Sequence, residues 1–155
     1  KQLRARLEEV LKDIYHPTDP SRGREQEFKA PQIVNGFLPP KRSDNIPDYP
    51  MVVVRPSEGD TERQEGRIQD LVTIKLIVGS YGEQDDDHEY CLVILRRIIN
   101  DLRSRPTLNN MFKARPEIKW KLSDEQATTI FILEAMIRFE IPTPQEVLED
   151  DGYAV

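Results

Sequence analysis

The apolar residues of the first fourteen positions recur at the spacing of an α-helix. Apart from the adjacent pair Val10 and Leu11, they follow one another at intervals of three or four residues and form one stripe: Leu3, Leu7, Val10, Leu11 and Ile14. Such a stripe is typical of an amphipathic helix that packs one side against a core. Pro17 disfavours a helical conformation at His16. The sequence therefore predicts an N-terminal amphipathic helix within residues 1–16.

The stretch from residue 17 to residue 50 breaks this periodicity. It holds seven prolines and two glycines among charged residues, a composition that favours loop or extended chain. We expect it to touch the core only near residues 32–34 and at Phe37 and Leu38. A connection of this length in a small domain usually serves a function or becomes ordered by a partner. We therefore predict a long Pro-rich loop or arm.

Short apolar runs then predict strands. Residues 51–54 are Met and three valines, and Pro56 ends this first strand. Residues 57–66 are polar and predict a loop. Residues 68–78 alternate, with Ile68, Val72, Ile74, Leu76 and Val78 on one side and Asp70 interrupting it, which predicts a second strand. Residues 79–82, Gly-Ser-Tyr-Gly, predict a turn.

The second half of the chain predicts one helix and two further strands. An apolar stripe from Cys91 to Leu102 at helical spacing predicts a helix over about 88–104, and Pro106 ends it. Residues 118–122 alternate apolar and Lys, and residues 127–141 alternate over a longer run, so both predict strands. The acidic residues 142–155 predict a C-terminal tail.

These elements predict a single domain of the α+β class. We expect an antiparallel sheet of about four strands with one main helix packed on one face, plus the N-terminal helix and the long Pro-rich loop. The expected parts are a helix over 1–16, a loop or arm over 17–50, an α+β core over 51–141 and a tail over 142–155. A chain of 155 residues can form one such core.

Charge is distributed unevenly along the chain, whose net charge is −6. Residues 57–90 carry 3 basic and 10 acidic side chains, residues 91–121 carry 8 and 2, and residues 122–155 carry 1 and 8. Oppositely charged segments can attract one another within a subunit or between subunits. Clustering of solvated loops and helix faces explains the same counts equally well. No apolar run approaches the length of a membrane span, and a single cysteine indicates synthesis in a reducing compartment.

Residues with chemical potential are few. The lone Cys91 lies on the apolar stripe, so a buried structural role is favoured over a nucleophile paired with His88. Asp85, Asp86 and Asp87 resemble a cation site, but the spacing of a calcium loop is absent and a helix start explains them better. Trp120 alternates with lysines and is expected to be half buried. We therefore predict no catalytic residue, no metal site and no cofactor.

Several segments of the sequence resemble those of tail terminator proteins of long-tailed phages and prophages. They are YPMVVVRP at 49–56, DLVTIKLIVGSY at 70–81, WKLSDEQ at 120–126 and FEIP at 139–142. The resemblance covers about residues 47–144, and the stretch from Pro17 to Pro47 is long for the family. It implies a non-enzymatic α+β subunit, without a cofactor, that forms a hexameric ring. Such a ring caps the tail tube, stops its polymerisation and offers a joining surface to the head connector.

The charge pattern adds a hypothesis about contacts within such a ring. An acidic loop with Glu58, Asp60, Glu62 and Glu65 would meet a basic side of a neighbour or of the connector, which consists of Arg96, Arg97, Arg103 and Arg105. DNA would only pass through the lumen, which residues 85–87 or 149–151 would line with negative charge. The expected location is the head-proximal end of the virion tail, with assembly in the host cytoplasm and no membrane partner.

Three alternatives remain open at this stage. The chain could be another phage neck, head–tail joining or head-completion component of similar fold. It could be a hydrolase or a metal-dependent enzyme that uses Asp85, Asp86, Asp87 and His88. It could also bind nucleic acid through the basic residues between Arg96 and Lys121, which the overall negative charge disfavours.

Overall fold

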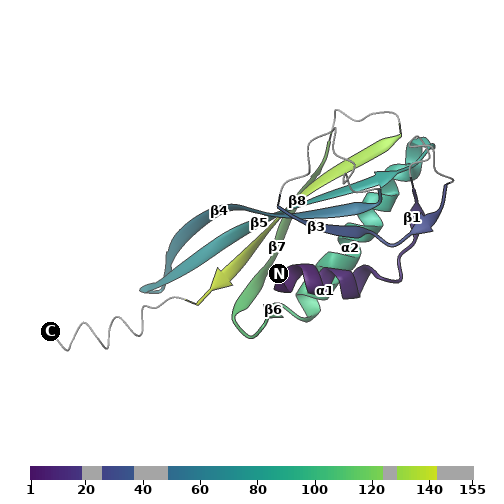
Figure 1. Ribbon diagram of the computed structural model, residues 1–155. Helices are drawn as coiled ribbons and strands as arrows, with labels where there is room; N and C mark the ends of the chain where they lie inside the picture. Colours follow the sequence, from purple (N-terminus) through teal and green to yellow (C-terminus); the bar gives the residue numbers. More distant parts are fainter. Residues whose placement is uncertain (19–25, 37–48, 124–128, 143–155) are drawn as a thin grey trace.

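The computed structural model describes residues 1–18, 26–36, 49–123 and 129–142. This part of the chain has an α+β fold with two helices, a six-stranded mixed sheet that curls strongly, and a separate two-stranded sheet (Figure 1). The predicted fold class is confirmed. The prediction of an antiparallel sheet of about four strands is wrong, because two more strands join it and one pairs in parallel.

Both predicted helices are present. Helix α1 spans Gln2–Leu11 and buries Leu3, Leu7 and Leu11. Helix α2 spans Glu89–Ser104 and follows a 3₁₀ turn at Asp85–His88. Its buried residues are Cys91, Ile94, Leu95, Ile98 and Leu102, which are the residues of the predicted stripe. The spacing of three and four residues brings each set onto one side of its helix.

The six-stranded sheet has the order β3-β4-β5-β8-β7-β6. Its strands are β3 (Gln32–Asn35), β4 (Met51–Gln64), β5 (Arg67–Tyr81), β6 (Thr107–Leu108), β7 (Phe112–Leu122) and β8 (Ile130–Ile141). Strand β3 runs parallel to β4, and all other neighbours are antiparallel. The small sheet pairs β1 (His16–Pro17) with β2 (Phe28–Lys29). The Pro-rich stretch therefore contributes β2, β3 and the second residue of β1, where the sequence predicted loop or extended chain, and His16 begins β1 although the predicted helix reached residue 16.

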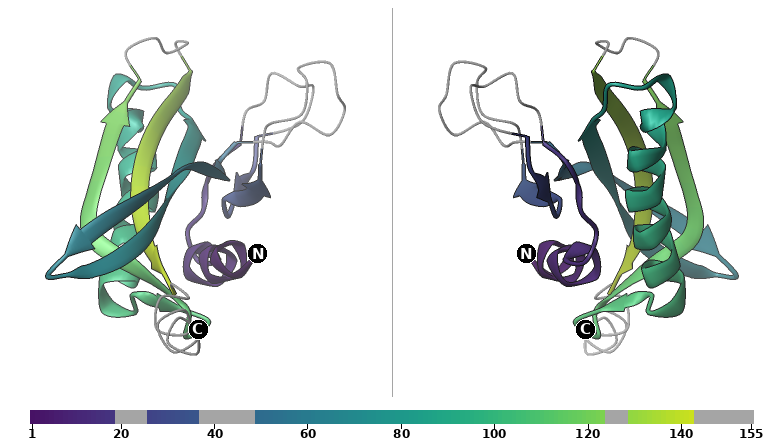
Figure 2. Two further views of the ribbon diagram at one scale, coloured as in Figure 1. Left: turned by 90° about the vertical axis from the view of Figure 1, so that its left-hand side faces the viewer. Right: turned by 90° about the vertical axis from the view of Figure 1, so that its right-hand side faces the viewer.

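One face of the large sheet forms the core together with the two helices. The core residues of the central strands are Val52, Val54, Leu76, Val78, Leu133, Ala135, Ile137 and Phe139. These are the sides that alternation predicted for β5 and β8. Figure 2 shows α2 running along this face, while the β4–β5 hairpin extends across the opposite side of the sheet. We call that opposite side the outer face.

The predicted polar loop at 57–66 is wrong, because most of it is strand. Strands β4 and β5 form one long hairpin with Glu65 and Gly66 as its two-residue turn, at φ values of 53° and 80°. Two positive φ values in a two-residue turn match the twist of a hairpin. Neither side of this part of β4 is apolar, so the alternation that reveals a half-buried strand is missing. A β-bulge between Pro56 and Glu58 separates it from the buried part.

The predicted turn at 79–82 is also wrong at its first three residues, which continue β5 and pair with β8. Gly79 serves close packing here, since a Cβ atom at this position would lie 2.5 Å from Cε1 of Tyr49. Strand β7 starts at Phe112, six residues before the predicted strand, and a bulge between Ala114 and Ile118 interrupts its pairing with β8. The predictions for Phe37, Leu38 and residues 143–155 lie outside the described residues.

Candidate assembly surface

The β4–β5 hairpin reaches beyond the strands beside it. Pairing of β5 with β8 extends to Asp70 opposite Ile141, whereas β4 and β5 remain paired as far as Gln64 opposite Arg67. The hairpin therefore continues past the described end of β8 and projects from the body of the fold (Figure 1). Of the predicted acidic residues, Glu58, Asp60 and Glu65 are exposed on this hairpin.

The fourth predicted acidic residue, Glu62, anchors the hairpin to the rest of the sheet. Its carboxylate lies 2.9 Å from a guanidinium nitrogen of Arg115 on β7 and also pairs with Arg138 on β8. Arg115 in turn lies 3.3 Å from Glu140 on β8. This ionic network joins three strands on the outer face. Leu71 lies on the same face, paired in register with Asp60 and Glu140, and is only 2% exposed.

The charges of the network stabilise one another. Hydrogen bonds from Arg115 and then from Arg138 hold the pKa of Glu62 below its ordinary value. For Arg115, burial works to lower the pKa, but the hydrogen bond and charge of Glu62, with the charge of Glu140, raise it overall. The network therefore keeps both groups ionised over a wide pH range. Sequence reasoning considered Arg115 only as one of the basic residues between Arg96 and Lys121 and did not single out Arg138, because the partnership of both with Glu62 depends on how the sheet curls.

A polar hollow lies on the outer face between the hairpin and β7. It has a volume of about 650 Å³, and its lining mixes acidic and basic side chains with two small residues and a methionine: Glu58, Gly59, Asp60, Glu62, Thr73, Glu117, Lys119, Met136 and Arg138. The predicted acidic residues thus share this surface with cations of β7 and β8. Those cations are not the predicted arginines of the helix.

The predicted basic residues lie on and just after α2, where three of the four contact their own subunit. Arg97 forms an ion pair with Asp13, at 3.0 Å between Nη1 and Oδ1. Arg105 pairs with Asp101, and Arg103 donates hydrogen bonds to the carbonyl of Pro116. Arg96 is exposed. Three of these arginines therefore link α2 or its C-terminal end to neighbouring parts of the same subunit.

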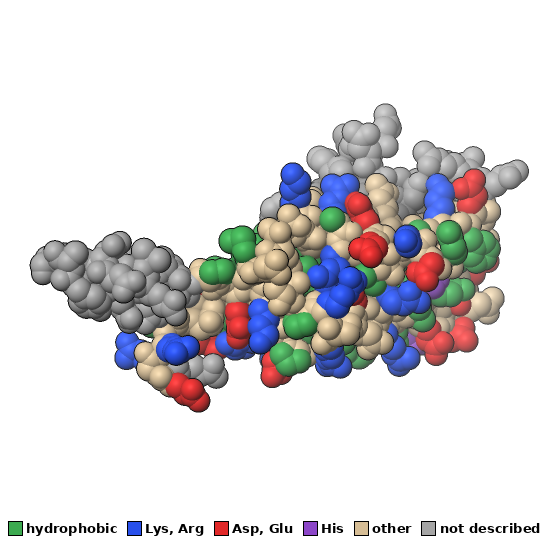
Figure 3. All heavy atoms as spheres, turned by 90° about the horizontal axis from the view of Figure 1, so that it is seen from below, with side chains coloured by type: hydrophobic (Ala, Val, Ile, Leu, Met, Phe, Trp, Pro, Cys, Tyr) green, Lys and Arg blue, Asp and Glu red, His purple; other side chains and the backbone are tan. Residues whose placement is uncertain are grey.

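Asp101 also receives a cation that the sequence did not single out. Nη1 of Arg6, on α1, lies 3.3 Å from its carboxylate and donates to the carbonyl of Arg105, and Nη2 donates to the carbonyl of Thr107. These bonds tie α1 to the end of α2. Figure 3 shows the resulting surface from below, where acidic and basic side chains are interspersed instead of forming separate patches.

Two strand edges are unpaired within the described part of the chain. Strand β3 covers β4 only as far as Val54, so the outer edge of β4 from Ser57 to Gln64 has no neighbouring strand. Strand β6 covers β7 only at its first two residues, which leaves the outer edge from Glu117 to Leu122. We call these the β4 edge and the β7 edge. Trp120 lies at the β7 edge and is 50% exposed.

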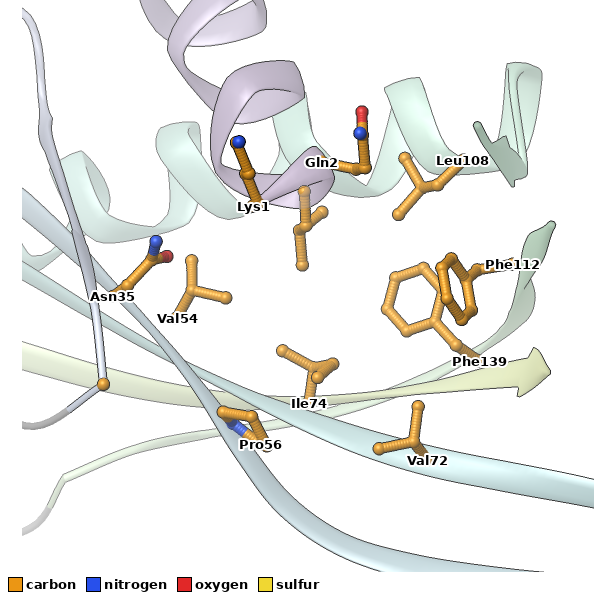
Figure 4. Close-up of a pocket in the computed structure, with 12 residues that line it drawn as sticks. Lys1, Gln2, Asn35, Val54, Pro56, Val72, Ile74, Leu108, Phe112 and Phe139 are labelled. Atoms are coloured by element: carbon orange, nitrogen blue, oxygen red, sulfur yellow. The ribbon is translucent and has the colours of Figure 1, made fainter. Parts of the chain in front are cut away.

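An apolar hollow of about 520 Å³ opens on the other face, between the start of α1 and the sheet. Figure 4 shows the side chains of Val54, Val72, Ile74, Phe112 and Phe139 directed into it, with Leu108 at one side. Lys1 and Gln2 lie at its rim and direct their polar ends away from it. The sequence did not indicate this hollow, because its walls come from seven separate elements.

The residues considered for catalysis or metal binding do not form a reactive group in the described part of the chain. Asp87 accepts a hydrogen bond from the backbone of Gln84 at 2.9 Å and belongs to a capping box, as predicted for a helix start. Among the described residues, no three His, Cys, Asp or Glu side chains are placed to hold a metal ion. Burial raises the pKa of Cys91 to about 11, and its sulfur lies 3.0 Å from Oγ of Ser80.

His16 is a buried polar residue that the sequence did not single out. It is 7% exposed, its ring centroid lies 4.6 Å from that of Tyr90, and its Nε2 has no hydrogen-bond partner in the described structure. Burial lowers its pKa below the ordinary 6.5, against the smaller effect of backbone hydrogen bonds at Tyr15 and Tyr90. The ring is therefore neutral at physiological pH.

Comparison with known proteins adds no family. No family model matches the chain, and no curated protein matches it by sequence. None of the described helices is long and apolar enough to cross a membrane. The described residues define an α+β protein with a projecting charged hairpin and two strand edges that no other described strand pairs with.

Proposed function

We propose that the protein is a structural subunit of a phage or prophage tail, namely a tail terminator. In this proposal, copies form a ring, with six subunits expected, at the head-proximal end of the tail tube. The ring stops tube polymerisation and offers the joining surface for the head connector. Its partners are further copies of itself, the tail tube protein and the connector, and DNA passes through its lumen. It acts in the virion after assembly in the host cytoplasm.

The observation that carries this proposal is the pair of strand edges that no other described strand covers. One is the β4 edge on the projecting hairpin, and the other is the β7 edge. A subunit in a ring needs two different surfaces that fit each other, because each copy contacts one neighbour on each side. The β4 edge and the β7 edge are two such surfaces, and the network at Glu62 holds the hairpin in a defined position. The sequence resemblance over residues 47–144 is the reason for proposing a tail terminator among the proteins that form rings.

The proposal assigns the chain no catalytic step, metal or cofactor. The residues that raised those possibilities have structural explanations where the structure describes them. Cys91 packs in the core with a raised pKa, and Asp87 caps the turn before α2. A thiol of this kind is a poor nucleophile, since the thiolate is the reactive form.

Tail tube assembly provides the direct test. Tube protein from the genome that encodes this chain would be polymerised with and without the purified chain, and tube lengths would be measured by negative-stain electron microscopy. We expect shorter tubes with a ring at one end. Unchanged tube lengths with no density at either end would overturn the proposal. Binding to isolated connector or portal rings without binding to tubes would instead identify another head–tail joining component.

A further inference from the structure

We infer that neighbouring copies join by strand pairing, with the β4 edge of one copy against the β7 edge of the next. This inference rests on the proposed ring and names the surfaces that close it. It replaces the helix arginines predicted from the sequence with residues of β7, since Arg97, Arg103 and Arg105 already contact their own subunit.

The backbone provides the first argument. An unpaired edge presents N–H and C=O groups that can extend a sheet onto another chain. Strand β4 is antiparallel to β5, β5 to β8, and β8 to β7, so β4 and β7 run in opposite directions within a subunit. A ring whose axis follows the strands keeps all copies in the same direction. The β4 edge therefore meets the neighbour's β7 edge as an antiparallel pair.

Charge decides which edges meet. The β4 edge carries Glu58, Asp60 and Glu62 with one cation, Arg63, whereas the β7 edge carries Lys119 and Lys121 with one acid, Glu117, so the two edges have opposite net charge. Glu58, Asp60 and Lys119 line the same hollow of their own subunit, but within the described structure these three and Lys121 form no ion pair, whereas Glu62 and Arg115 pair with each other. Two β4 edges would place carboxylates opposite carboxylates, and two β7 edges would place lysines opposite lysines. The mixed pairing brings edges of opposite net charge together, which favours a ring over a two-fold dimer.

Apolar contact and proline positions support the same pairing. Trp120 stands between the two lysines and is half exposed, and tryptophan is enriched among the residues that dominate interface energies. Pro56 precedes the β4 edge and Pro116 precedes the β7 edge. Because proline cannot donate a backbone hydrogen bond, each limits the ladder to the residues that follow it.

Charge reversal tests this interface. One variant carries Glu58→Lys with Asp60→Lys, so both of its edges are basic. The other carries Lys119→Glu with Lys121→Glu, so both of its edges are acidic. Ring formation would be measured by native mass spectrometry and negative-stain electron microscopy. A Lys12→Glu with Arg96→Glu variant is the matched control, since it reverses two exposed cations outside the β7 edge.

We expect each reversed variant alone to stay below ring size, while the control forms rings like the wild type. An equimolar mixture of the two reversed variants should form rings again, and only rings with an even number of subunits in which the variants alternate. On assembly of the wild type, amide hydrogen exchange should slow at 57–64 and 117–122. This measurement tests the backbone pairing without any change of charge.

The outcomes separate the inference from the function on which it rests. Wild-type rings that survive both reversals, or that the control variant disrupts instead, would overturn the edge pairing and leave the tail terminator proposal standing. Rings without added protection at the two edges would do the same. A wild-type chain that forms no ring, alone or on tube ends, would overturn both.

Discussion

Glu62 and Arg115 form an ion pair of 2.9 Å although two strands, β5 and β8, separate their own strands in the sheet. In a flat sheet, three strand spacings would place their backbones about 14 Å apart, and side chains that stand perpendicular to the sheet would not meet across that distance. The pair therefore requires the sheet to curl toward its outer face. Figure 2 shows the hairpin crossing this face, with α2 on the other side. The curl brings an acidic strand and a basic strand to one surface.

The pair predicts a pH-dependent contribution to stability. The pKa of Glu62 in the folded chain lies below its ordinary 4.5, so its ionised form is favoured by folding. This contribution is present above pH 4.5 and is lost as the pH falls through the folded pKa. Glu62→Gln should lower the melting temperature at pH 7, and the difference from the wild type should close below pH 4.5.

Glu65→Gln is the control for this experiment, because Glu65 lies exposed in the hairpin turn and forms no ion pair in the described structure. It should melt like the wild type at pH 7. Equal melting temperatures for the wild type and Glu62→Gln at pH 7 would show that the network contributes nothing measurable to stability.

The hairpin turn predicts different responses at two glycines. Gly66 has a φ of 80°, so Gly66→Ala should cost about 1–2 kcal/mol of local stability. Gly59 lies in the strand, and a Cβ atom there would meet only the carbonyl oxygen of Leu71 at an ordinary 3.8 Å. Gly59→Ala should therefore change stability little. Amide exchange of the hairpin would measure both, and equal effects would contradict the turn geometry.

His16 predicts a loss of stability in mild acid. Its folded pKa is lowered by burial, so below pH 6.5 the unfolded chain binds a proton that the folded chain does not. The free energy of unfolding should be constant above about pH 7.5 and should fall as the pH drops through 6.5. His16→Phe keeps an aromatic ring beside Tyr90 and should flatten this dependence in urea unfolding measured from pH 7.5 to 5. A variant with the wild-type slope would exclude His16 as its source.

Cys91 predicts slow thiol labelling in the native state. With a pKa of about 11 and a buried sulfur, only about one thiol in a thousand would be ionised at pH 8 even if reagent could reach it. Labelling by a disulfide reagent should therefore proceed at the rate of unfolding and become fast in denaturant. Val93→Cys in a Cys91→Ser background places a thiol at an exposed position of α2 and should label at once. Equally fast labelling of native Cys91 would contradict its burial.

Residue spacing alone was sufficient for the parts of the fold that touch the core. Leu3, Leu7 and Leu11, and the stripe from Cys91 to Leu102, predicted both helices, because a helix must turn its apolar side toward the core. Alternation predicted the buried sides of β5 and β8 for the same reason. The sequence also predicted that the acidic residues 85–87 begin a helix, since a capping box involves only residues close in sequence.

Tertiary structure decided everything that depends on strand neighbours. Strand β4 beyond Pro56 is held by backbone pairing and carries polar side chains on both sides, so it shows no periodic signal. The parallel β3, the curl of the sheet and the meeting of Glu62 with Arg115 follow from strand order, which local sequence does not encode. Thus the sequence determined which sides of the helices and central strands face the core and where acidic side chains gather. Only the fold decided that a basic strand faces them, because pairing distant strands is a property of the whole sheet.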